Sequence, residues 1–499
     1  MSNWGGRREN SGRHTIREEK KRKAYNIYLR EEEKRNIERY GKGNTFSSKL
    51  VELIFSEISR RKKKIKFIDL FAGMGGIRLG LEEACSTLGI ESECVLTSEI
   101  KTSALKVLKE NFEHKNLVGN IEEIIPSEIE DFDILLAGFP CQPFSSAGNR
   151  YGFLDTRGTL FFNIEKILKE KKPMAFILEN VEGLVTHDLE NKTDKIGKTL
   201  KVILSVLKDL GYIVNWKVLD AQYFGVAQSR KRVYIVGTLK EEISLENFNI
   251  SKCTLDKVLE KNLPVIESHF TSCLLKKYSL EELYGKAIKD KRGGENNIHS
   301  WDIGLKGEIT SFQKSILEIL FKERRRKKWA EEIGIKWMDG MPLTLEQIHS
   351  FIDCPISELE KELTELTKLG YLKLEFPKKE IILEDGRKKR VYAEDKKRGY
   401  NIVAGKLSFE FTKILDPREI CPTLVAMDVD KIGVVDEGGI RKLSLREGLR
   451  LCGYPENYSL DIFDKDINSR KEAFDLLGNT VVVPVIRNIS ERLLKVIVE

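Results

Sequence analysis

The hydrophobic pattern of the chain changes character near residue 65. From there to about residue 250, short and continuously apolar runs recur, and patterns with helical spacing, such as 77–88 and 200–210, lie between most of them. The apolar runs occupy residues 65–70, 95–98, 132–137, 174–178 and 232–236. Continuously apolar strands that alternate with helices predict an α/β fold, in which a mostly parallel sheet is covered by helices on both faces.

The same pattern divides the chain into parts. Polar and basic residues precede the periodic region, a charged and irregular stretch follows it, and compact α/β character returns near residue 420. We therefore expect four parts: a basic N-terminal extension at 1–62, a core at 63–250, an inserted region at 251–418 and a C-terminal part at 419–499 that completes the core.

The N-terminal extension has the order strand, helix, helix. A short apolar strand at 24–29 is followed by helical patterns at 30–40 and 45–59. This order resembles ribbon-helix-helix DNA-binding domains, which dimerise through paired strands and read the major groove with them. The resemblance implies a DNA-binding module and a dimer formed through it. The alternative is a helical extension packed on the core.

The inserted region contains a second recognisable order. Helical patterns at 344–352 and 356–369 precede strand patterns at 370–374 and 380–383. Two helices followed by a hairpin resemble a winged helix, and a generic helical insertion is the alternative.

Composition narrows the setting and the partners. The net charge is only +7, from 85 Lys and Arg against 78 Asp and Glu, but basic residues are clumped at 20–23, 60–64, 324–328 and 387–390. Such clumps favour a polyanionic partner. The eight cysteines form no C-x-x-C pair, so neither a metal site nor a disulfide framework is expected. Without an apolar run long enough to cross a membrane, a cytoplasmic protein associated with the nucleoid is expected.

The candidate chemistry lies where predicted strands end. Cys141 follows the apolar run 132–137 and stands between Pro140 and Pro143. The prolines fix φ and remove backbone donors, which favours a presented side chain over a packed one. The carboxyl edge of an open α/β sheet is where ligands bind, so Cys141 is a candidate nucleophile.

Polar residues follow the other predicted strands. Glu179 ends the strand at 174–178, and a buried carboxyl group there can exchange a proton. Arg230 and Arg232 precede the last strand, where their guanidinium groups are candidates to bind a carbonyl oxygen, hold Glu179 and lower the pKa of the thiol.

A glycine-rich turn follows the first strand. Gly73, Gly75 and Gly76 open a helix, and their spacing departs from the G-x-G-x-x-G of dinucleotide sites. Backbone amides at a helix N-terminus favour a carboxylate ligand. Glu99, at the tip of the second strand, is positioned as a residue that binds ribose hydroxyls.

Six blocks in order resemble the DNA cytosine-5 methyltransferase family, in its prokaryotic restriction–modification form. They are Phe71-Ala72-Gly73-Met74-Gly75-Gly76, Pro140-Cys141-Gln142, Glu179-Asn180-Val181, Gln228-x-Arg230-x-Arg232, Arg446-Glu447 with Leu451-Cys452-Gly453-Tyr454-Pro455, and Gly478-Asn479-Thr480 followed by Val481-Val482-Val483-Pro484. The resemblance covers about 65–250 and 418–499. It implies a Rossmann-like, S-adenosylmethionine-dependent methyltransferase core and a separate target-recognition region.

The resemblance also implies the cofactor and its site. S-adenosylmethionine is the expected methyl donor, and no metal is expected. The implied cofactor-binding residues are Phe71, Gly73, Gly75, Glu99, Ile100, Asn120, Pro140 and Asn479. One of them departs from the family pattern, because Asn120 stands where the family usually has aspartate. An uncharged amide puts cofactor affinity in doubt rather than the reaction.

The implied reaction begins with a cytosine swung out of duplex DNA. The Cys141 thiolate adds to ring carbon 6, Glu179 protonates N3, and Arg232 with Arg230 holds the carbonyl oxygen and the Glu179 carboxylate. Carbon 5 then takes the methyl group, and Cys141 leaves after carbon 5 loses its proton. Glycines at 148, 152 and 158 fit a mobile loop that closes on DNA.

The region at about 253–418 is expected to read the DNA sequence. Residues 322–329 are predicted to form a basic helix with an aromatic side chain that contacts phosphates. The expected function is sequence-specific methylation that protects host DNA from a cognate restriction endonuclease. Two alternatives are an RNA substrate and a DNA-binding repressor with a degenerate methyltransferase body, although the intact motifs argue against degeneracy.

Overall fold

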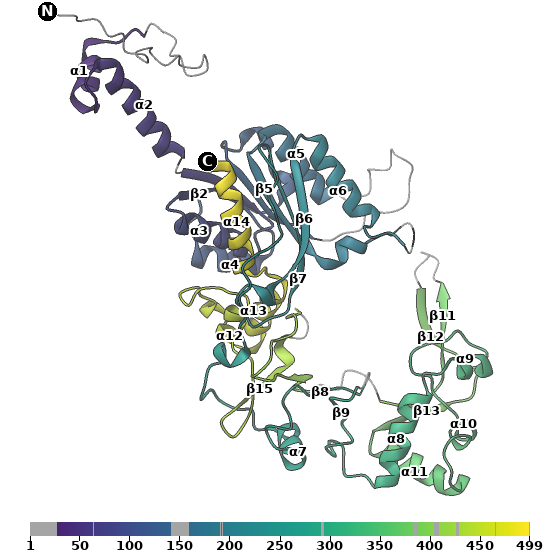
Figure 1. Cartoon of the computed structure of the whole chain (residues 1–499). Helices are drawn as coiled ribbons and strands as arrows, with labels where there is room; N and C mark the ends of the chain where they lie inside the picture. The colour runs from purple at the N-terminus through teal and green to yellow at the C-terminus, as the bar shows by residue number, and fades with distance from the viewer. Residues whose placement is uncertain are drawn as a thin grey trace, which may run out of the picture. The chain divides into compact units, whose positions relative to one another are not determined.

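The structure is a computed structural model, and it describes residues 27–62, 64–140, 159–189, 191, 193–290, 294–382, 388–403, 409–425, 429–464 and 466–498. The chain divides into two compact units, Met1–Lys64 and Ile65–Glu499 (Figure 1).

A seven-stranded sheet forms the centre of the second unit. Its strand order is β3-β2-β1-β4-β5-β7-β6. The strands are β1 (Lys64–Leu70), β2 (Glu91–Ser98), β3 (Leu117–Val118), β4 (Ile134–Gly138), β5 (Ala175–Val181), β6 (Ile213–Asp220) and β7 (Lys231–Thr238). β1, β4 and β5 pair in parallel, as do β2 and β3, whereas β7 runs antiparallel to both β5 and β6. The predicted, mostly parallel α/β sheet is therefore confirmed.

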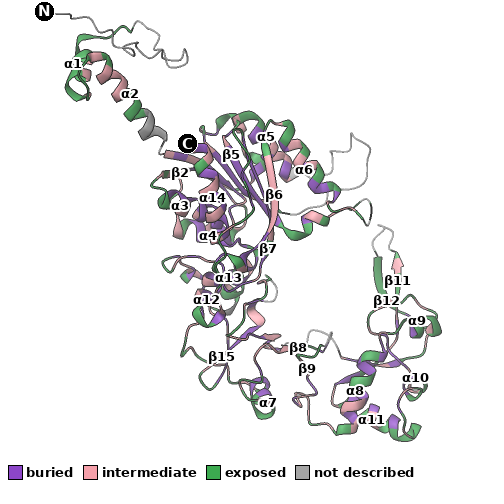
Figure 2. Cartoon of the chain, viewed as in Figure 1, coloured by how far each residue is buried: buried purple, intermediate pink, exposed green. Residues whose placement is uncertain are grey.

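Helices cover both faces of this sheet. α3 (Gly76–Thr87) and α14 (Val483–Val498) pack on one face, and α5 (Thr159–Lys171) and α6 (Lys198–Asp209) pack on the other. Because both faces are covered, β4 and β5 are buried almost throughout (Figure 2). This explains why the central strands are continuously apolar.

The last part of the chain returns to the core of the second unit. α14 lies against α3, and a Cβ on Gly80 would come within 2.6 Å of Ile486, so this close contact depends on glycine. α4 (Thr102–Asn111) shares a hydrophobic cluster with α12 (Leu445–Leu451) and α13 (Ile467–Asn479). Residues near the two ends of this unit thus build a single core.

The region between the core segments begins and ends with a small mixed sheet. Its strand order is β16-β15-β14-β8-β9, and α7 (His269–Lys277) shares its hydrophobic cluster. The strands are β8 (Ala287–Ile288), β9 (Asn297–Ile298), β14 (Lys413–Ile414), β15 (Ile432–Asp436) and β16 (Gly439–Lys442).

A helical module with its own hydrophobic core lies between β9 and β14 in the sequence. Its helices are α8 (Ser311–Glu323), α9 (Lys327–Ile333), α10 (Leu345–His349) and α11 (Ile356–Lys368). Its strands are β10 (Leu372–Glu375), β11 (Lys378–Ile382), β12 (Lys388–Tyr392) and β13 (Gly399–Ile402). The two helices and the next two strands follow in the predicted order. The predicted hairpin between 370–374 and 380–383 is wrong, because β10 pairs with β13 and β11 pairs with β12. The winged-helix interpretation stays a prediction.

The expectation of one basic helix across 322–329 is wrong. α8 ends at Glu323, α9 begins at Lys327, and Arg324 between them is 4% exposed. The Arg324 guanidinium donates to Asn401 Oδ1 at 2.5 Å, and the Trp329 side chain is buried in the module core. The run breaks because its first arginine is part of the packing of the module.

The first unit contains α1 (Glu31–Tyr40) and α2 (Phe46–Lys62). Residues 27–30 have no strand assignment, and 24–26, the other half of the predicted strand, lie outside the described residues.

Among the described residues of the chain, no helix is both long and apolar enough to cross a membrane. Nor does the described part of the chain bring three or more His, Cys, Asp or Glu side chains into a metal-binding group.

Candidate active site

The glycine-rich turn connects β1 to α3 in a strained conformation. Phe71, Gly73 and Gly75 all have positive φ, of 54°, 55° and 72°. A Cβ on Gly75 would meet the ring of Phe112 at 2.5 Å, so packing also demands glycine there. At Gly73 a Cβ would meet nothing within 4 Å among the described residues. The backbone at Gly73 is therefore open to a ligand, as the sequence predicted for this turn.

Glu99 lies directly beside this turn. Its Oε2 accepts a hydrogen bond from the Gly73 amide at 2.7 Å, and its Oε1 accepts one from the Lys101 amide at 2.7 Å. Each carboxylate oxygen keeps a lone pair for a further donor. Ile100, the next residue, is 73% exposed, which is unusual for an apolar side chain at a sheet edge. The predicted ribose and adenine residues thus lie together at the ends of β1 and β2.

Asn120 follows β3, the neighbour of β2. Its Oδ1 accepts from the Glu122 amide at 3.1 Å, so it caps the short helix Ile121–Glu123. The Ser98 hydroxyl donates to the Gly119 carbonyl at 3.2 Å and ties the two strand ends together. An asparagine performs this capping as well as an aspartate does. The departure from the family pattern is therefore compatible with the local fold.

The ends of β4, β5 and β7 form the edge where the chemistry was expected. Gly138 of β4 pairs with Glu179 of β5, and Arg232 of β7 pairs with Val181. The Asn180 side-chain amide, 2% exposed, donates to the Phe139 carbonyl at 2.8 Å. This bond fixes the backbone that leads into Pro140 and Cys141. Pro140 is exposed, whereas Cys141 and the loop at 145–158 lie outside the described residues.

Glu179 and Arg232 form an ion pair at this edge. Glu179 Oε1 lies 3.1 Å from Arg232 Nε, and their side chains are 11% and 15% exposed. Burial raises the pKa of Glu179, and the positive charges of Arg232 and Arg230 offset only part of that rise. Desolvation therefore favours the protonated acid, which can donate a proton as well as accept one.

Arg230 does not share this position. It is 1% exposed, and its guanidinium donates to the carbonyls of Leu424, Gly478 and Thr480, at 3.0, 3.0 and 2.5 Å. Because Nη1 and Nη2 are committed to backbone, Arg230 does not present the end of its guanidinium to a substrate carbonyl. Its buried Nε has no hydrogen-bond partner among the described residues. The direct role expected for it needs correction, because the strand β7 begins only at Lys231 and the residue before it turns into the core. Arg230 is a positioning residue.

Sequence reasoning missed several long-range contacts that hold the site together. The Gln228 amide donates to the Leu451 carbonyl at 2.8 Å and accepts from the Leu424 amide at 3.2 Å. The Tyr458 hydroxyl donates to the Met74 carbonyl inside the glycine-rich turn. Such contacts join segments 196 or more residues apart, and no local sequence pattern predicts them.

Asn479 ends α13 and is exposed. Its amide donates to the Asp475 carbonyl at 2.8 Å, and Asp475 forms an ion pair with Lys101. Lys101 follows Ile100 and Glu99, so this pair brings the end of α13 to the cofactor residues of β2. The predicted contact between Asn479 and the cofactor stays a prediction.

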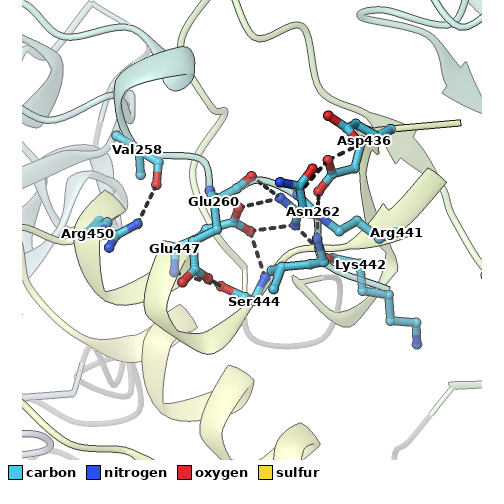
Figure 3. A network of polar contacts seen from close by, with 11 residues as sticks. Val258, Glu260, Asn262, Asp436, Arg441, Lys442, Ser444, Glu447 and Arg450 are labelled. Carbon is cyan, nitrogen blue, oxygen red and sulfur yellow. Dashed lines mark hydrogen bonds and ion pairs between the residues drawn. The ribbon is translucent and has the colours of Figure 1, made fainter. Parts of the chain in front are cut away.

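A buried ion network joins the chain that leaves the core to the chain that returns (Figure 3). Arg441, 2% exposed, pairs with Asp436 at 2.6 Å and with Glu447 at 2.7 Å, and donates to the Glu260 carbonyl at 2.8 Å. Burial alone would raise the pKa of Asp436, but hydrogen bonds from Arg441 and from backbone amides outweigh it and hold the pKa at about 2. The network fixes the base of the inserted region.

These observations define the class of protein. A mostly parallel sheet carries an open glycine turn with a neighbouring carboxylate, and beside it an acid–guanidinium pair where a strand leads into Pro140-Cys141. This combination is that of a cofactor-dependent transferase acting at the carboxyl edge of the sheet.

Comparison with known proteins identifies the family. Residues 65–495 match the family model described as C-5 cytosine-specific DNA methylase. Type II methyltransferase M.NlaIV of Neisseria lactamica is 56% identical over 432 residues, which cover 87% of this chain and 99% of that protein. Type II methyltransferase M.BanI of Aneurinibacillus aneurinilyticus is 40% identical over 456 residues, covering 86% and 96%. Among solved structures, the S. pombe Dnmt2 methyltransferase aligns over 86% of this chain and 98% of that one, with 17% identity and a TM-score of 0.46.

The chain belongs to the C-5 cytosine-specific DNA methylase family, as the six ordered blocks predicted. It is a DNA (cytosine-5-)-methyltransferase, which takes the methyl group from S-adenosylmethionine and transfers it to carbon 5 of cytosine in DNA.

Proposed function

We propose that this enzyme methylates one cytosine within a specific duplex sequence and so protects DNA from a cognate restriction endonuclease. The observation that carries the site assignment is the buried Glu179–Arg232 pair, which lies beside the strand end leading into Cys141. The type II methyltransferases to which the chain is similar support the restriction–modification role.

The site residues fit S-adenosylmethionine. The open backbone at Gly73, the Glu99 carboxylate beside it and the exposed Ile100 would hold the donor, together with Phe71, Gly75, Asn120, Pro140 and Asn479. When bound, S-adenosylmethionine supplies an activated methyl group on a sulfonium. The protein residues bind the donor and exclude water from it.

Cys141 and Glu179 carry out the covalent chemistry in this proposal. The Cys141 thiolate forms a bond to cytosine carbon 6, and the electron pair of the ring moves to N3, which takes the Glu179 proton. Arg232 binds the carbonyl oxygen of the base and holds Glu179 in place. Carbon 5 becomes nucleophilic and accepts the methyl group. It then loses its proton to solvent, N3 returns its proton to Glu179, and the bond to Cys141 breaks to release the thiolate.

Two experiments test the assignment. Cys141→Ser should abolish methyl transfer and leave binding of S-adenosylmethionine nearly intact, and fluorinated cytosine at the target should trap a covalent adduct at Cys141. Normal turnover by Cys141→Ser, or an adduct at another residue, would contradict the mechanism.

Bisulfite sequencing of DNA from expressing cells identifies the methylated sequence, and parallel assays on duplex DNA and RNA test the substrate.

We also propose that the first unit dimerises with the same unit of a second copy. None of its residues from 27 to 57 is buried, and several apolar side chains are exposed, including Tyr28 at 94%, Phe55 at 64% and Ile54 at 45%. Two helices this short cannot build a stable core alone. In a ribbon-helix-helix domain the strands of two copies pair with each other, so these strands would form only in the dimer. A single chain without a strand at 27–30 is therefore compatible with this interpretation.

The mass of the full chain in solution tests this proposal. We expect a dimer by sedimentation equilibrium, and a monomer for the double variant Ile54→Glu with Phe55→Glu. The matched control is Ser56→Glu on the same helix, which should remain dimeric. A monomeric wild-type protein would overturn the proposal, while unchanged methylation in all three proteins would show that the second unit is intact.

A further inference from the structure

The helical module carries a basic hairpin that the catalytic mechanism does not use. β11 pairs with β12 in antiparallel register, from Lys378 opposite Tyr392 to Ile382 opposite Lys388. The segment 378–392 contains six lysines and arginines against three acidic residues. In Figure 1 the hairpin extends from the helices of its module.

The hairpin is anchored at its base and exposed beyond it. β10 and β13, which flank the hairpin in sequence, form a second two-stranded sheet, and Leu372 and Ile402 in it are 1% exposed in the module core. The Ala393 amide donates to the Pro377 carbonyl at 2.8 Å and continues the ladder outward. A two-stranded ribbon that projects into solvent is only marginally stable by itself, so this anchoring gives the outer part a defined position.

The two faces of the hairpin differ. Paired residues lie on the same face, and one face carries Ile381 and Val391, which are half-buried, as well as Lys379 and Lys389. On the opposite face Ile382 is 71% exposed and Tyr392 is 48% exposed. This free face is the set Lys378, Glu380, Ile382, Lys388, Arg390 and Tyr392.

The charges at the end of the hairpin are largely uncommitted. Within the described part of the chain, the side chains of Lys389 and Arg390 form no hydrogen bond or ion pair. Lys388 lies 3.4 Å from Glu380, which also binds Lys336 at 3.2 Å. The hydrogen bond from Lys336 and then that from Lys388 lower the pKa of Glu380, so it stays ionised at neutral pH. Among the described residues, the three consecutive cations Lys388 to Arg390 therefore face solvent with one ion pair, between Lys388 and Glu380.

Helix α11 of the module lacks the same basic character at its N-terminus. In a helix-turn-helix arrangement the N-terminal residues of the second helix meet the bases. That helix would be α11, and Glu358 and Glu360 are exposed near its N-terminus. Carboxylates at this position would be repelled by DNA phosphates. If the module is a winged helix, its charge distribution favours contact through the hairpin and not through the helix.

We propose that the β11–β12 hairpin binds the sugar–phosphate backbone of the duplex DNA that the enzyme methylates. Lys388 and Arg390 on its free face and Lys389 between them on the other face are the phosphate-binding residues. The inference rests on the DNA methyltransferase function. Phosphate contacts release counterions and fix the orientation of a protein on the duplex without reading its sequence.

The salt dependence of duplex binding tests the proposal. The full-length triple variant Lys388→Gln, Lys389→Gln, Arg390→Gln is compared with wild type on a linearised plasmid duplex by filter binding at several salt concentrations. The exponent of the salt dependence is the slope of the logarithm of the binding constant against the logarithm of the salt concentration. Its magnitude should fall by about 2 to 3 in the triple variant, since each phosphate contact contributes about 0.9. The matched control is Arg326→Gln, Lys361→Gln, Lys368→Gln, which removes the same charge from other surfaces of the same module and should lower the exponent by less than about 1.

A variant that removes a negative charge from the hairpin should have the opposite effect on binding. Glu380→Gln removes the one acid of the free face and releases Lys336 and Lys388, so it should tighten binding at low salt by a few-fold. Equal effects in the triple variant and its control, or looser binding by Glu380→Gln, would overturn the hairpin proposal. A wild-type protein that neither binds nor methylates duplex DNA would instead overturn the enzyme function. An unchanged exponent in the triple variant would also overturn the proposal, because it would show that the hairpin does not bind DNA phosphates.

Discussion

Two sets of basic side chains in this molecule are held in opposite ways. At the catalytic edge, Arg232 is nearly buried and paired with Glu179, and Arg230 is fully buried with its donors on backbone carbonyls. On the hairpin, Lys389 and Arg390 are exposed and have no ion-pair partner among the described residues. The first arrangement fixes geometry at a cost in desolvation, and the second keeps charge available for a polyanion.

The difference separates two tasks of the same enzyme. A buried pair changes the protonation of a reacting group, which affects the chemical step. An exposed cation acts on the encounter with DNA, which salt screens. Substitutions in the two places should therefore change different measured quantities, kcat in one and the salt dependence of binding in the other.

The largest effect is expected for Glu179→Gln. An amide cannot protonate N3, so kcat should fall by about 10²- to 10⁴-fold, the usual contribution of general acid catalysis. The salt dependence of duplex binding should stay that of wild type. Glu182→Gln, three residues later and exposed, serves as the matched control and should keep full activity. A changed salt exponent in Glu179→Gln would break the division between the two regions.

The pH profile sharpens the same prediction. Because burial raises the pKa of Glu179, the protonated acid persists above the usual pKa of a glutamate. kcat should then decline as pH rises through that raised pKa, with the protonated form as the active one. A profile that rises over that range would assign the opposite protonation state to Glu179.

The second prediction concerns stability in the ion network of Figure 3. Arg441→Met leaves Asp436 and Glu447 buried without their partner and should cost about 3–5 kcal/mol in the free energy of unfolding. The control is Arg418→Met, which breaks an ion pair whose arginine is 74% exposed and should cost less than about 1 kcal/mol. Urea denaturation of the three proteins measures both values, and equal losses would contradict the role of burial.

The sequence predicted most of the sheet and the edge at which Glu179 and Arg232 lie. Five strands lie within a few residues of the apolar runs, because each is buried on both faces and so reads as apolar. β6 was not predicted, since it forms the edge of the sheet and carries Asn215 and Lys217 among half-buried positions. β3 has only two residues and leaves no pattern.

The roles of individual arginines were harder to predict. Arg230 and Arg232 alternate toward the same side in sequence, yet only Arg232 reaches Glu179. The difference comes from Leu424, Gly478 and Thr480, whose carbonyls capture Arg230 from far along the chain. Likewise, the four basic runs have similar compositions, which give no indication of which run is used for packing. Long-range partners decide these roles, and a single sequence does not display them.

The third prediction tests a buried group without a partner. Asp69 is fully buried, neither carboxyl oxygen has a hydrogen-bond partner among the described residues, and burial raises its pKa to about 8. Below pH 4 both folded and unfolded states are protonated, so no penalty arises. Between pH 4 and 8 only the unfolded state loses the proton, and stability falls. Asp69→Asn removes this dependence.

The measurement is the melting temperature of Asp69→Asn and wild type across that range. The difference between variant and wild type should shift in favour of the variant as pH rises from 4 to 8, by a few degrees, and then stay constant. Asp131→Asn, a substitution at an exposed aspartate, is the control and should show no such trend. A difference that shrinks with rising pH would mean that Asp69 is ionised in the folded protein.

The smallest effect is expected for Arg326→Gln in the basic run that was predicted to contact phosphates. Arg326 pairs with Glu323 at 2.8 Å, its neighbour Arg325 pairs with Asp339, and Lys328 lies 4.1 Å from the ring of Trp329. Because these charges are already paired within the module, duplex affinity should change less than twofold and stability by less than about 1 kcal/mol. Arg390→Gln, the same substitution on the hairpin, should weaken binding several-fold. If the two variants bind alike, pairing within the fold does not distinguish cations that bind DNA from those that do not, and the contrast between the two regions fails.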